Sequence, residues 1–244
     1  MTPYELLFSA SIPFLPALYG RARRDIRRLI VESGLSRPCV LDVGGRKSPY
    51  TVGLPADVTI LDMPRESELQ EQLDLGLTNN TLRHLRHRSN IGAVILQDMT
   101  RSNLPSASYD GVICVEVIEH VVADDAFVRQ IARVLKPGGW AYFTTPNGDY
   151  IRNAPPDYNP DHVKHFRRQE LHDLLALHFD AVDVRWGIKT GKYRYLGLRT
   201  LTPRHPLSTA QAMAGNVISG WESRGLDEQP QRTAHLLAMA RKRA

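Results

Sequence analysis

A series of short apolar segments, each ending in an acidic residue or a glycine turn, limits the folds open to this 244-residue chain more than any other feature. The first segment ends in Asp42-Val43-Gly44-Gly45, the second in Leu61-Asp62 and the third in Leu96-Gln97-Asp98. Stretches with helical periodicity separate most of these segments, which predicts βαβ units and a mostly parallel sheet. Because parallel strands end at the same edge, the three carboxylates are expected to lie together there, where open α/β sheets bind ligands.

The spacing predicts a Rossmann-like α/β fold with a seven-stranded sheet and helices on both faces. Strands are expected at residues 39–43, 57–61, 93–97, 110–115, 139–145, 181–186 and 235–241, and helices at 20–35, 66–88, 121–135, 168–178 and 208–222. The connection between the first two strands contains Pro49, Gly53 and Pro55. It is therefore expected to hold about one helical turn at most, instead of a crossover helix.

The length suits a single main domain with additions. We expect an N-terminal helical flap over residues 1–35, a main domain over 36–244, and an insertion over 187–232 before the last strand. Residues 147–166, rich in Pro, Asn and Asp, are expected to form a long loop over the strand ends. Long segments at this edge of a sheet serve as lids or substrate walls, which is the role expected for residues 187–232.

The composition is that of an ordinary globular protein, with 42% hydrophobic residues, 23% charged residues and a net charge of +5. Basic clusters lie at residues 21–28, 83–88 and 241–243. Few aromatic residues accompany them, which argues against a stacking surface for single-stranded nucleic acid. We expect solvated helix faces at these clusters and no nucleic-acid partner.

The apolar segment at residues 6–18 contains two prolines and lacks a basic leader, so it fits neither a signal peptide nor a spanning helix. We expect it to pack on the domain as part of the flap, in a cytoplasmic protein, with contact to a membrane surface as the alternative. Both cysteines, Cys39 and Cys114, lie in apolar strand-like runs and are expected to be buried, reduced thiols.

The ordered series of motifs resembles the class I S-adenosylmethionine-dependent methyltransferases over roughly residues 36–186. The motifs that carry the resemblance are the turn at 42–45, Asp62, Asp98, the run Tyr109–Val121, and Lys136-Pro137-Gly138-Gly139 before the fifth strand. The resemblance implies S-adenosylmethionine as the cofactor and a methyltransferase domain over residues 36–244.

An acid at the end of the second strand can accept hydrogen bonds from both ribose hydroxyls, which is the role expected for Asp62. The resemblance implies that the Gly44-Gly45 turn holds the amino-acid moiety and that Asp98 and Met99 flank the adenine, while Asp42 acts through water or fixes the turn. The full set of expected cofactor contacts is Asp42, Gly44, Gly45, Asp62, Met63, Asp98, Met99 and Val115. The chain departs from the family pattern Asp-x-Gly-x-Gly-x-Gly, because Arg46 and Ser48 stand at the last two glycine positions.

Glu116, Glu119 and His120 are spaced to share one face of a helix that begins after the fourth strand. The Glu-x-x-Glu-His run is similar to that of the ubiquinone-pathway O-methyltransferases and of the small-RNA 3′-terminal 2′-O-methyltransferases. The resemblance would place a divalent cation on Glu116, Glu119, His120 and His162. In the alternative without metal, Glu119 caps helix amides and His120 bonds a loop. His162 or His165 is then the candidate base, because imidazole titrates near neutrality, and His120 completes the set of candidate catalytic residues.

The segment Thr145-Pro146-Asn147, the later Asn-Pro-x-His and the run Phe166–Leu171 resemble the small-molecule and glycan-modifying branch of the family. We expect methyl transfer to a hydroxyl oxygen of a small molecule, such as a sugar, a quinone or a secondary metabolite. Two alternatives stay open: a 2′-O-methyltransferase for RNA 3′ ends, and a binding module with the methyltransferase fold but no activity. The motifs leave the oligomeric state open.

Overall fold

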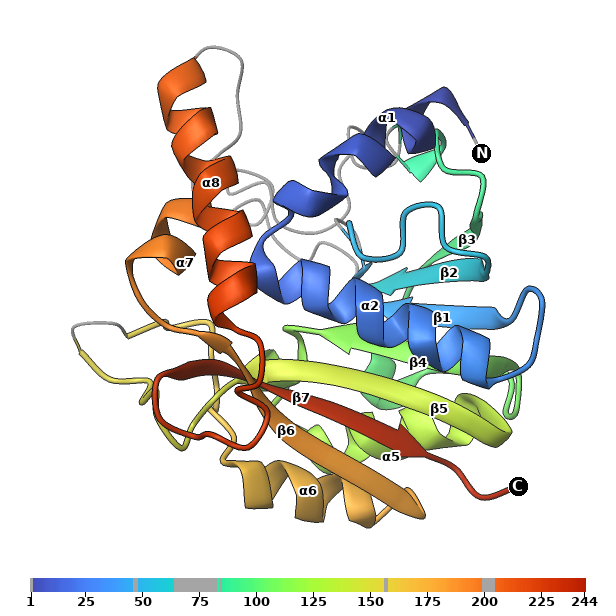
Figure 1. Cartoon of the computed structure of the whole chain (residues 1–244). Coiled ribbons are helices and arrows are strands. Elements are labelled where there is room, and N and C mark those ends of the chain that lie inside the picture. The colour runs from blue at the N-terminus through green and yellow to red at the C-terminus, as the bar shows by residue number, and fades with distance from the viewer. Residues whose placement is uncertain (1, 46–47, 64–82, 84, 156–157, 199–204) are drawn as a thin grey trace.

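The computed structural model describes residues 2–45, 48–63, 83, 85–155, 158–198 and 205–244. One seven-stranded sheet with the order β3-β2-β1-β4-β5-β7-β6 runs through it (Figure 1). The strands are β1 Cys39–Val43, β2 Asp57–Asp62, β3 Ile91–Leu96, β4 Tyr109–Val115, β5 Leu135–Pro146, β6 Ala181–Lys189 and β7 Thr233–Arg241. β1 to β5 pair in parallel, and β7 runs antiparallel to β5 and β6. The predicted sheet is confirmed.

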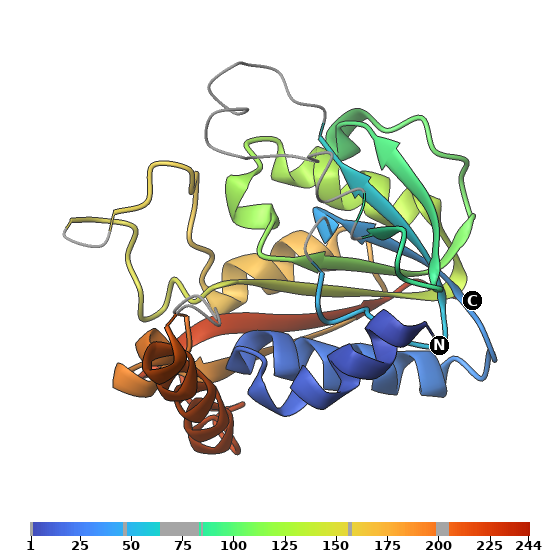
Figure 2. The ribbon, with the colours of Figure 1, turned by 90° about the horizontal axis from the view of Figure 1, so that it is seen from above.

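Helices cover both faces of the sheet, as predicted. The helices are α1 Pro3–Ser11, α2 Ala17–Glu32, α5 Asp124–Val134, α6 Arg168–Ala176, α7 Lys192–Gly197 and α8 Pro206–Glu222, with short 3-10 turns at Ile12–Phe14, Met99–Arg101 and Ile118–His120. Figure 2 shows α1 and α2 on one side of the sheet and α5 and α6 on the other.

Alternating side chains of the central strands divide the core between the two faces. On β5, Trp140 and Tyr142 belong to the cluster that α2 covers. Ala141 and Phe143 belong to the cluster that α5 and α6 cover. All four are buried, so the apolar run of β5 packs against two helical layers at once.

Some sequence predictions need correction or lie outside the described residues. The described part of the segment between β1 and β2 forms turns, as expected, whereas the helix predicted at 66–88 lies mostly outside the described residues. Both cysteines are free thiols and Cys114 is buried, but Cys39 is exposed. The prediction for Cys39 is wrong because this residue is the first of β1, and the buried part of the strand begins only at the next residue.

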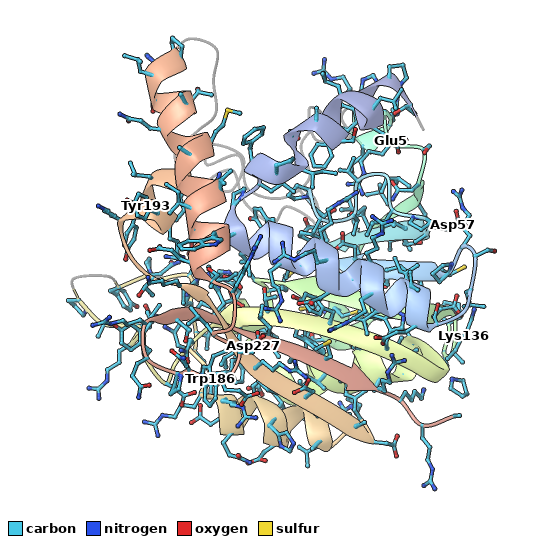
Figure 3. The ribbon with its side chains drawn as sticks, in the orientation of Figure 1. Glu5, Asp57, Lys136, Trp186, Tyr193 and Asp227 are labelled. Carbon is cyan, nitrogen blue, oxygen red and sulfur yellow. The ribbon has the colours of Figure 1, made fainter. Side chains whose placement is uncertain are left out.

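The N-terminal segment and the insertion meet beside the carboxyl edge of the sheet. The apolar face of α2 packs on the sheet through Ile26 and Leu29. Arg21 pairs with Asp227 at 2.8 Å, which ties α2 to the segment after α8. Asp227 is labelled in Figure 3. β6 continues to Lys189, so the predicted insertion at 187–232 contributes to the sheet before it forms α7 and α8. No helix among the described residues is long and apolar enough to cross a membrane. The division into a flap and a main domain stays a prediction.

Candidate active site

A cavity of about 330 Å³ lies at the carboxyl ends of β1, β2 and β3, beside the turn that follows β4. It is lined by Val43, Gly44, Leu61, Asp62, Met63, Gln97, Asp98, Met99, Thr100, Val117, His120, Val121, Val122, Ala123 and Phe127. Five of the expected cofactor contacts therefore surround one cavity: Gly44, Asp62, Met63, Asp98 and Met99. Their contact with a cofactor stays a prediction. The apolar wall formed by Val117, Val121 and Phe127 was not anticipated, because its residues look like ordinary core positions in the sequence.

Gly44 is required by the backbone of the turn. Its φ angle is +71°, and an added Cβ would lie 2.5 Å from Cγ2 of Val117. Its N–H donates to the Leu61 carbonyl at 2.7 Å, which ties the end of β1 to the end of β2. Glycine is thus the residue that lets this backbone border the cavity closely.

Asp42, Gly45 and Val115, the other expected cofactor contacts, do not line this cavity, and their contact with a cofactor also stays a prediction. The Asp42 carboxylate is fully buried and accepts from the Tyr50 hydroxyl at 3.1 Å and the Thr51 hydroxyl at 3.5 Å. A Cβ on Gly45 would collide with this carboxylate. Of the two roles expected for Asp42, the geometry therefore fits fixation of the turn. Val115 packs in the core beneath α2.

Burial raises the pKa of Asp42 to about 6, although hydrogen bonds and the nearby Arg88 guanidinium favour the carboxylate. Arg88 is itself buried and donates to the Thr51 hydroxyl at 2.6 Å and to the Ser48 hydroxyl at 3.3 Å. Ser48, at a glycine position of the family pattern, therefore faces this internal network, while Arg46 lies outside the described residues. Arg88 was expected on a solvated face because its sequence neighbours are basic, and this expectation is wrong for it.

The run Glu116 to His120 does not form the expected helical face. Glu116 has a φ angle of +56°, a 3-10 turn covers Ile118–His120, and α5 begins only at Asp124. The Glu116 carboxylate points toward the sheet, where it accepts from the Thr144 hydroxyl at 2.8 Å and lies 3.2 Å from Nδ1 of His235. The predicted four-residue metal site is therefore wrong for Glu116.

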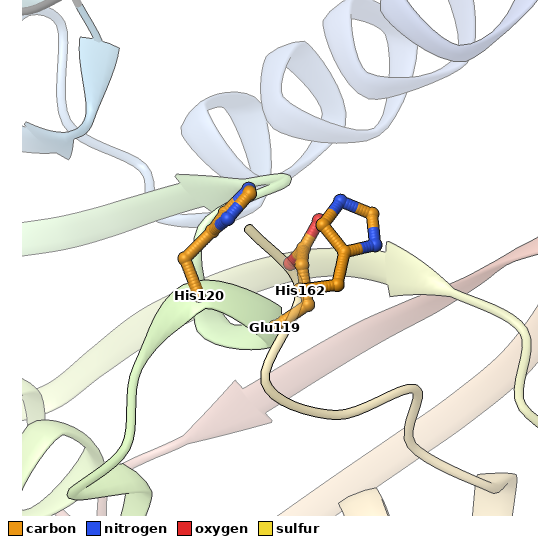
Figure 4. A group of neighbouring side chains, drawn as sticks. All are labelled: Glu119, His120 and His162. Atoms are coloured by element: carbon orange, nitrogen blue, oxygen red, sulfur yellow. The ribbon is translucent and has the colours of Figure 1, made fainter. Parts of the chain in front are cut away.

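Glu119, His120 and His162 do come together, with ligand atoms within 4.8 Å of one another (Figure 4). Glu119 is buried, and among the described residues neither carboxylate oxygen makes a hydrogen bond of regular geometry, although the equally unpartnered Thr145 hydroxyl is its polar neighbour. Burial and the negative charge of Glu116 raise the pKa of Glu119 well above its usual value. A carboxylate in this position is stabilised by a proton or by a cation.

Two backbone carbonyls determine the tautomers of the neighbouring histidines. Nδ1 of His120 lies 2.8 Å from the Asp161 carbonyl, and Nδ1 of His165 lies 2.9 Å from the Ile151 carbonyl. Since a carbonyl can only accept, both Nδ1 atoms carry protons. When neutral, His165 then accepts at Nε2 from Nδ1 of His162, 2.8 Å away. In His120 and in neutral His162 the ring nitrogen with a free lone pair is therefore Nε2. This atom can accept a proton or bind a metal ion.

Burial lowers the pKa of His162, and the neighbouring His120 and His165 lower it further, while the carboxylates of Glu116 and Asp161 oppose them. Because a lowered pKa keeps the imidazole neutral near pH 7, His162 is able to accept a proton there. His162 and His165 do not line the 330 Å³ cavity, whereas His120 does. The three rings form a connected group in the 147–166 loop and the turn after β4.

A second cavity of about 140 Å³ lies between α2, the α7–α8 segment and the ends of β6 and β7. It is lined by Pro16, Ala17, Leu18, Tyr19, Glu116, Ile188, Arg194, Leu198, Asn216, Ser219 and His235. Sequence reasoning missed this site. The available signal was His235, a titratable residue at the start of an otherwise apolar strand segment.

A ligand cavity at the carboxyl edge of a parallel sheet defines a class of α/β proteins that bind nucleotide-like ligands. The model of the methyltransferase domain family matches residues 17–178. The chain belongs to the class I S-adenosylmethionine-dependent methyltransferase family, so the resemblance carried by the motifs is confirmed.

Relatives and solved structures agree with this assignment. A protein of Mycolicibacterium smegmatis, named a probable S-adenosylmethionine-dependent methyltransferase, is 31% identical over 142 residues, which is 57% of this chain and 53% of the relative. The ubiquinone biosynthesis O-methyltransferase of Shewanella pealeana is 30% identical over 178 residues, 64% of this chain and 70% of the relative. The first of these matches spans about half of the relative's length.

Among solved structures, phosphoethanolamine N-methyltransferase 2 of Haemonchus contortus, in complex with S-adenosyl-L-methionine, has a TM-score of 0.58 and 16% identity, covering 89% of this chain and 52% of that one. The 1,6-didemethyltoxoflavin-N1-methyltransferase of Burkholderia thailandensis has a TM-score of 0.53 and 16% identity, covering 94% of this chain and 80% of that one. These likenesses show the fold alone.

Proposed function

We propose that this protein transfers a methyl group from S-adenosylmethionine to a hydroxyl oxygen of a small molecule. The observation that carries the proposal is the cavity at the strand ends, bordered by Asp62 and by a glycine that cannot be replaced without a clash. Asp62 would accept from the ribose hydroxyls, Asp98 and Met99 would flank the adenine, and the Gly44 backbone would border the amino-acid moiety. When bound, S-adenosylmethionine supplies the methyl group from its sulfonium.

The histidine group supports an oxygen acceptor, because a hydroxyl must lose its proton during the reaction. His162 is the candidate base: its neutral form offers Nε2, and hydrogen bonding through His165 to the Ile151 carbonyl fixes its orientation. In this role His162 takes the hydroxyl proton at Nε2. His120 borders the cofactor cavity and its ring packs against that of His162, so the candidate base would stand beside the cofactor.

The second candidate role of Glu119, His120 and His162 is to bind a divalent cation. The unpartnered carboxylate of Glu119 and the two Nε2 atoms fit such an ion, although a mixed oxygen and imidazole set does not select one metal. A bound cation would lower the pKa of an acceptor hydroxyl. Dialysis against a chelator, followed by addition of Mg²⁺, Mn²⁺ or Zn²⁺, separates the readings: activity that survives chelation contradicts the metal.

The first experiment is calorimetric titration of S-adenosylhomocysteine into chelator-treated protein, followed by transfer of labelled methyl groups to a panel of small hydroxylated compounds. We expect micromolar binding and transfer to at least one compound. His162→Asn should lower turnover strongly while the affinity for S-adenosylhomocysteine changes less than about threefold, whereas the matched control His172→Asn, on an exposed helical surface, should change neither.

The absence of S-adenosylhomocysteine binding, in protein confirmed to be folded, would contradict the proposal and favour a binding module without activity. Methylation of RNA 3′ ends with steeply salt-dependent binding would instead favour the RNA alternative, because phosphate contacts release counterions.

A further inference from the structure

The second cavity adjoins the cofactor cavity at the end of β4. Glu116 lines the second cavity and the next residue, Val117, lines the first. The positive φ angle of Glu116 directs these consecutive side chains to the two sides. A molecule in the second cavity would therefore lie beside the site proposed for the cofactor.

A chain of charged and polar groups crosses this second cavity. The His235 ring is buried, with Nδ1 3.2 Å from the Glu116 carboxylate and Nε2 3.2 Å from a guanidinium nitrogen of Arg194. Because a guanidinium can only donate, Nε2 accepts and Nδ1–H donates to Glu116. Charge and hydrogen bonds of His235, with the Thr144 hydroxyl, outweigh burial and lower the pKa of Glu116. The His235 ring thus lies between the Glu116 carboxylate and the Arg194 guanidinium.

Arg194 retains most of its hydrogen-bonding capacity. Among the described residues, the only hydrogen bond of its side chain is to His235, and no carboxylate lies within 4 Å of the guanidinium, which also packs over the Tyr195 ring. Glu116, the nearest acid in this group, contacts the opposite edge of the His235 ring. A guanidinium has five N–H donors in a fork that matches a carboxylate, so Arg194 can bind an anion at the side away from Glu116.

Ser219 provides a second, independent indication of a ligand. This residue is 2% exposed and lines the cavity, yet its hydroxyl oxygen is buried without a hydrogen-bond partner among the described residues. A buried, unpartnered hydroxyl destabilises the folded protein, and a polar ligand group in the cavity would supply the missing hydrogen bond. Leu18, Ile188 and the ring of Tyr19 also line this cavity and add apolar surface to it.

We propose that the second cavity binds the methyl acceptor and that the acceptor is a small hydroxy acid whose carboxylate pairs with Arg194. This inference rests on the proposed function and adds the acceptor site and its chemical class. Glu116 and His235 are positioning residues that hold the guanidinium in place, and Ser219 bonds a second polar group of the acceptor.

The test uses the full chain and matched pairs of probes: 3,4-dihydroxybenzoate with its amide, and glucuronate with glucuronamide. Each is titrated with and without saturating S-adenosylhomocysteine. For at least one pair we expect the acid to bind about tenfold tighter than the amide, because only the acid carries the negative charge that a guanidinium fork pairs with. Arg194→Gln should reduce this preference to less than twofold, and Arg194→Lys should keep part of it. The control Arg224→Gln, which removes an exposed arginine after α8, should retain it in full.

Ser219→Ala tests the cavity with a variant that should still fold, because removal of an unpartnered hydroxyl should not lower the melting temperature. It should weaken acid and amide equally. Equal affinities for acid and amide in every pair would overturn this inference, as would a preference that survives Arg194→Gln. If the acid preference holds but S-adenosylhomocysteine does not bind, the cavity stands as an acid-binding site and the proposed methyl transfer fails.

Discussion

Replacement of Asp42 by asparagine should change the stability of this protein with opposite signs at low and high pH. Burial raises the pKa of this carboxyl from 3.8 to about 6. Between these values the folded protein retains a proton that the unfolded chain releases, so the free energy of unfolding falls as pH rises. The difference between these two pKa values corresponds to about 3 kcal/mol in the free energy of unfolding. Asparagine does not titrate and lacks this decrease.

Near pH 4 the variant should be less stable than the parent by about 1–2 kcal/mol. Both carboxylate oxygens of Asp42 accept hydrogen bonds, from the hydroxyls of Tyr50 and Thr51. In asparagine an NH₂ group, which can only donate, replaces one of these oxygens, so one of the two hydrogen bonds is lost. Above pH 7 the parent carries the cost of a buried charge, so the variant should be the more stable protein by about 1–2 kcal/mol. Urea unfolding of both proteins between pH 4 and pH 8 measures this difference. Asp173→Asn, at an exposed position on α6, is the matched control and should show no such change of sign.

Two results would refute the reasoning about Asp42. A stability difference that stays constant from pH 4 to pH 8 would mean that the carboxyl does not hold its proton as described. Affinity for S-adenosylhomocysteine should change by less than about threefold, because this carboxylate does not line the cofactor cavity. A loss of about a hundredfold with unchanged stability would instead place Asp42 in contact with the cofactor.

Three further substitutions test separate parts of the site. Gly44→Ala should destabilise the protein by at least about 1–2 kcal/mol in urea unfolding, because alanine disfavours a φ angle of +71° and its Cβ would meet Val117; unchanged stability would contradict this backbone geometry of the turn. Asp62→Asn should weaken S-adenosylhomocysteine about 10- to 100-fold in calorimetry, since one charged acceptor is lost; equal affinity would exclude Asp62 from the ribose. Glu119→Gln should be more stable than the parent at pH 8 without metal, because burial and Glu116 raise the pKa of Glu119 and the folded state loses stability as pH rises through it; a less stable variant would show that the carboxylate is stabilised there.

The sheet was predictable because its determinants are local in the sequence. Apolar runs of five to nine residues, ended by a glycine turn or an acid, mark strands wherever both faces are covered. Lys136-Pro137-Gly138-Gly139 was expected as a turn before the fifth strand. In the structure β5 begins earlier, at Leu135, so residues 136–139 lie within the strand. At this point the pairing of β4 with β5 shifts register, between Tyr109 and Gly111 of β4.

The parts of the site that were not predictable depend on contacts between distant residues. Glu116 has helical spacing to Glu119, but hydrogen bonds from Thr144 and His235 accompany a left-handed backbone that no local pattern signals. Arg88 looks like one more surface arginine until the fold brings it close to the buried Asp42. Sequence spacing therefore identified the residues around the first cavity and missed the second, whose walls come from α2, α7, α8 and two strands.

The position of β7 has a consequence for how this chain acquires its structure during synthesis. Residues 233–241 follow all the other elements, yet they pair with β5 on one side and β6 on the other. While these residues are still inside the ribosome, β5 has an unpaired edge and β6 has no neighbour among the described strands. Because exposed strand edges favour aggregation, the nascent chain passes through a vulnerable stage that lasts until residues 233–241 emerge and pair. His235 belongs to that strand, so the second cavity is completed in the same late step.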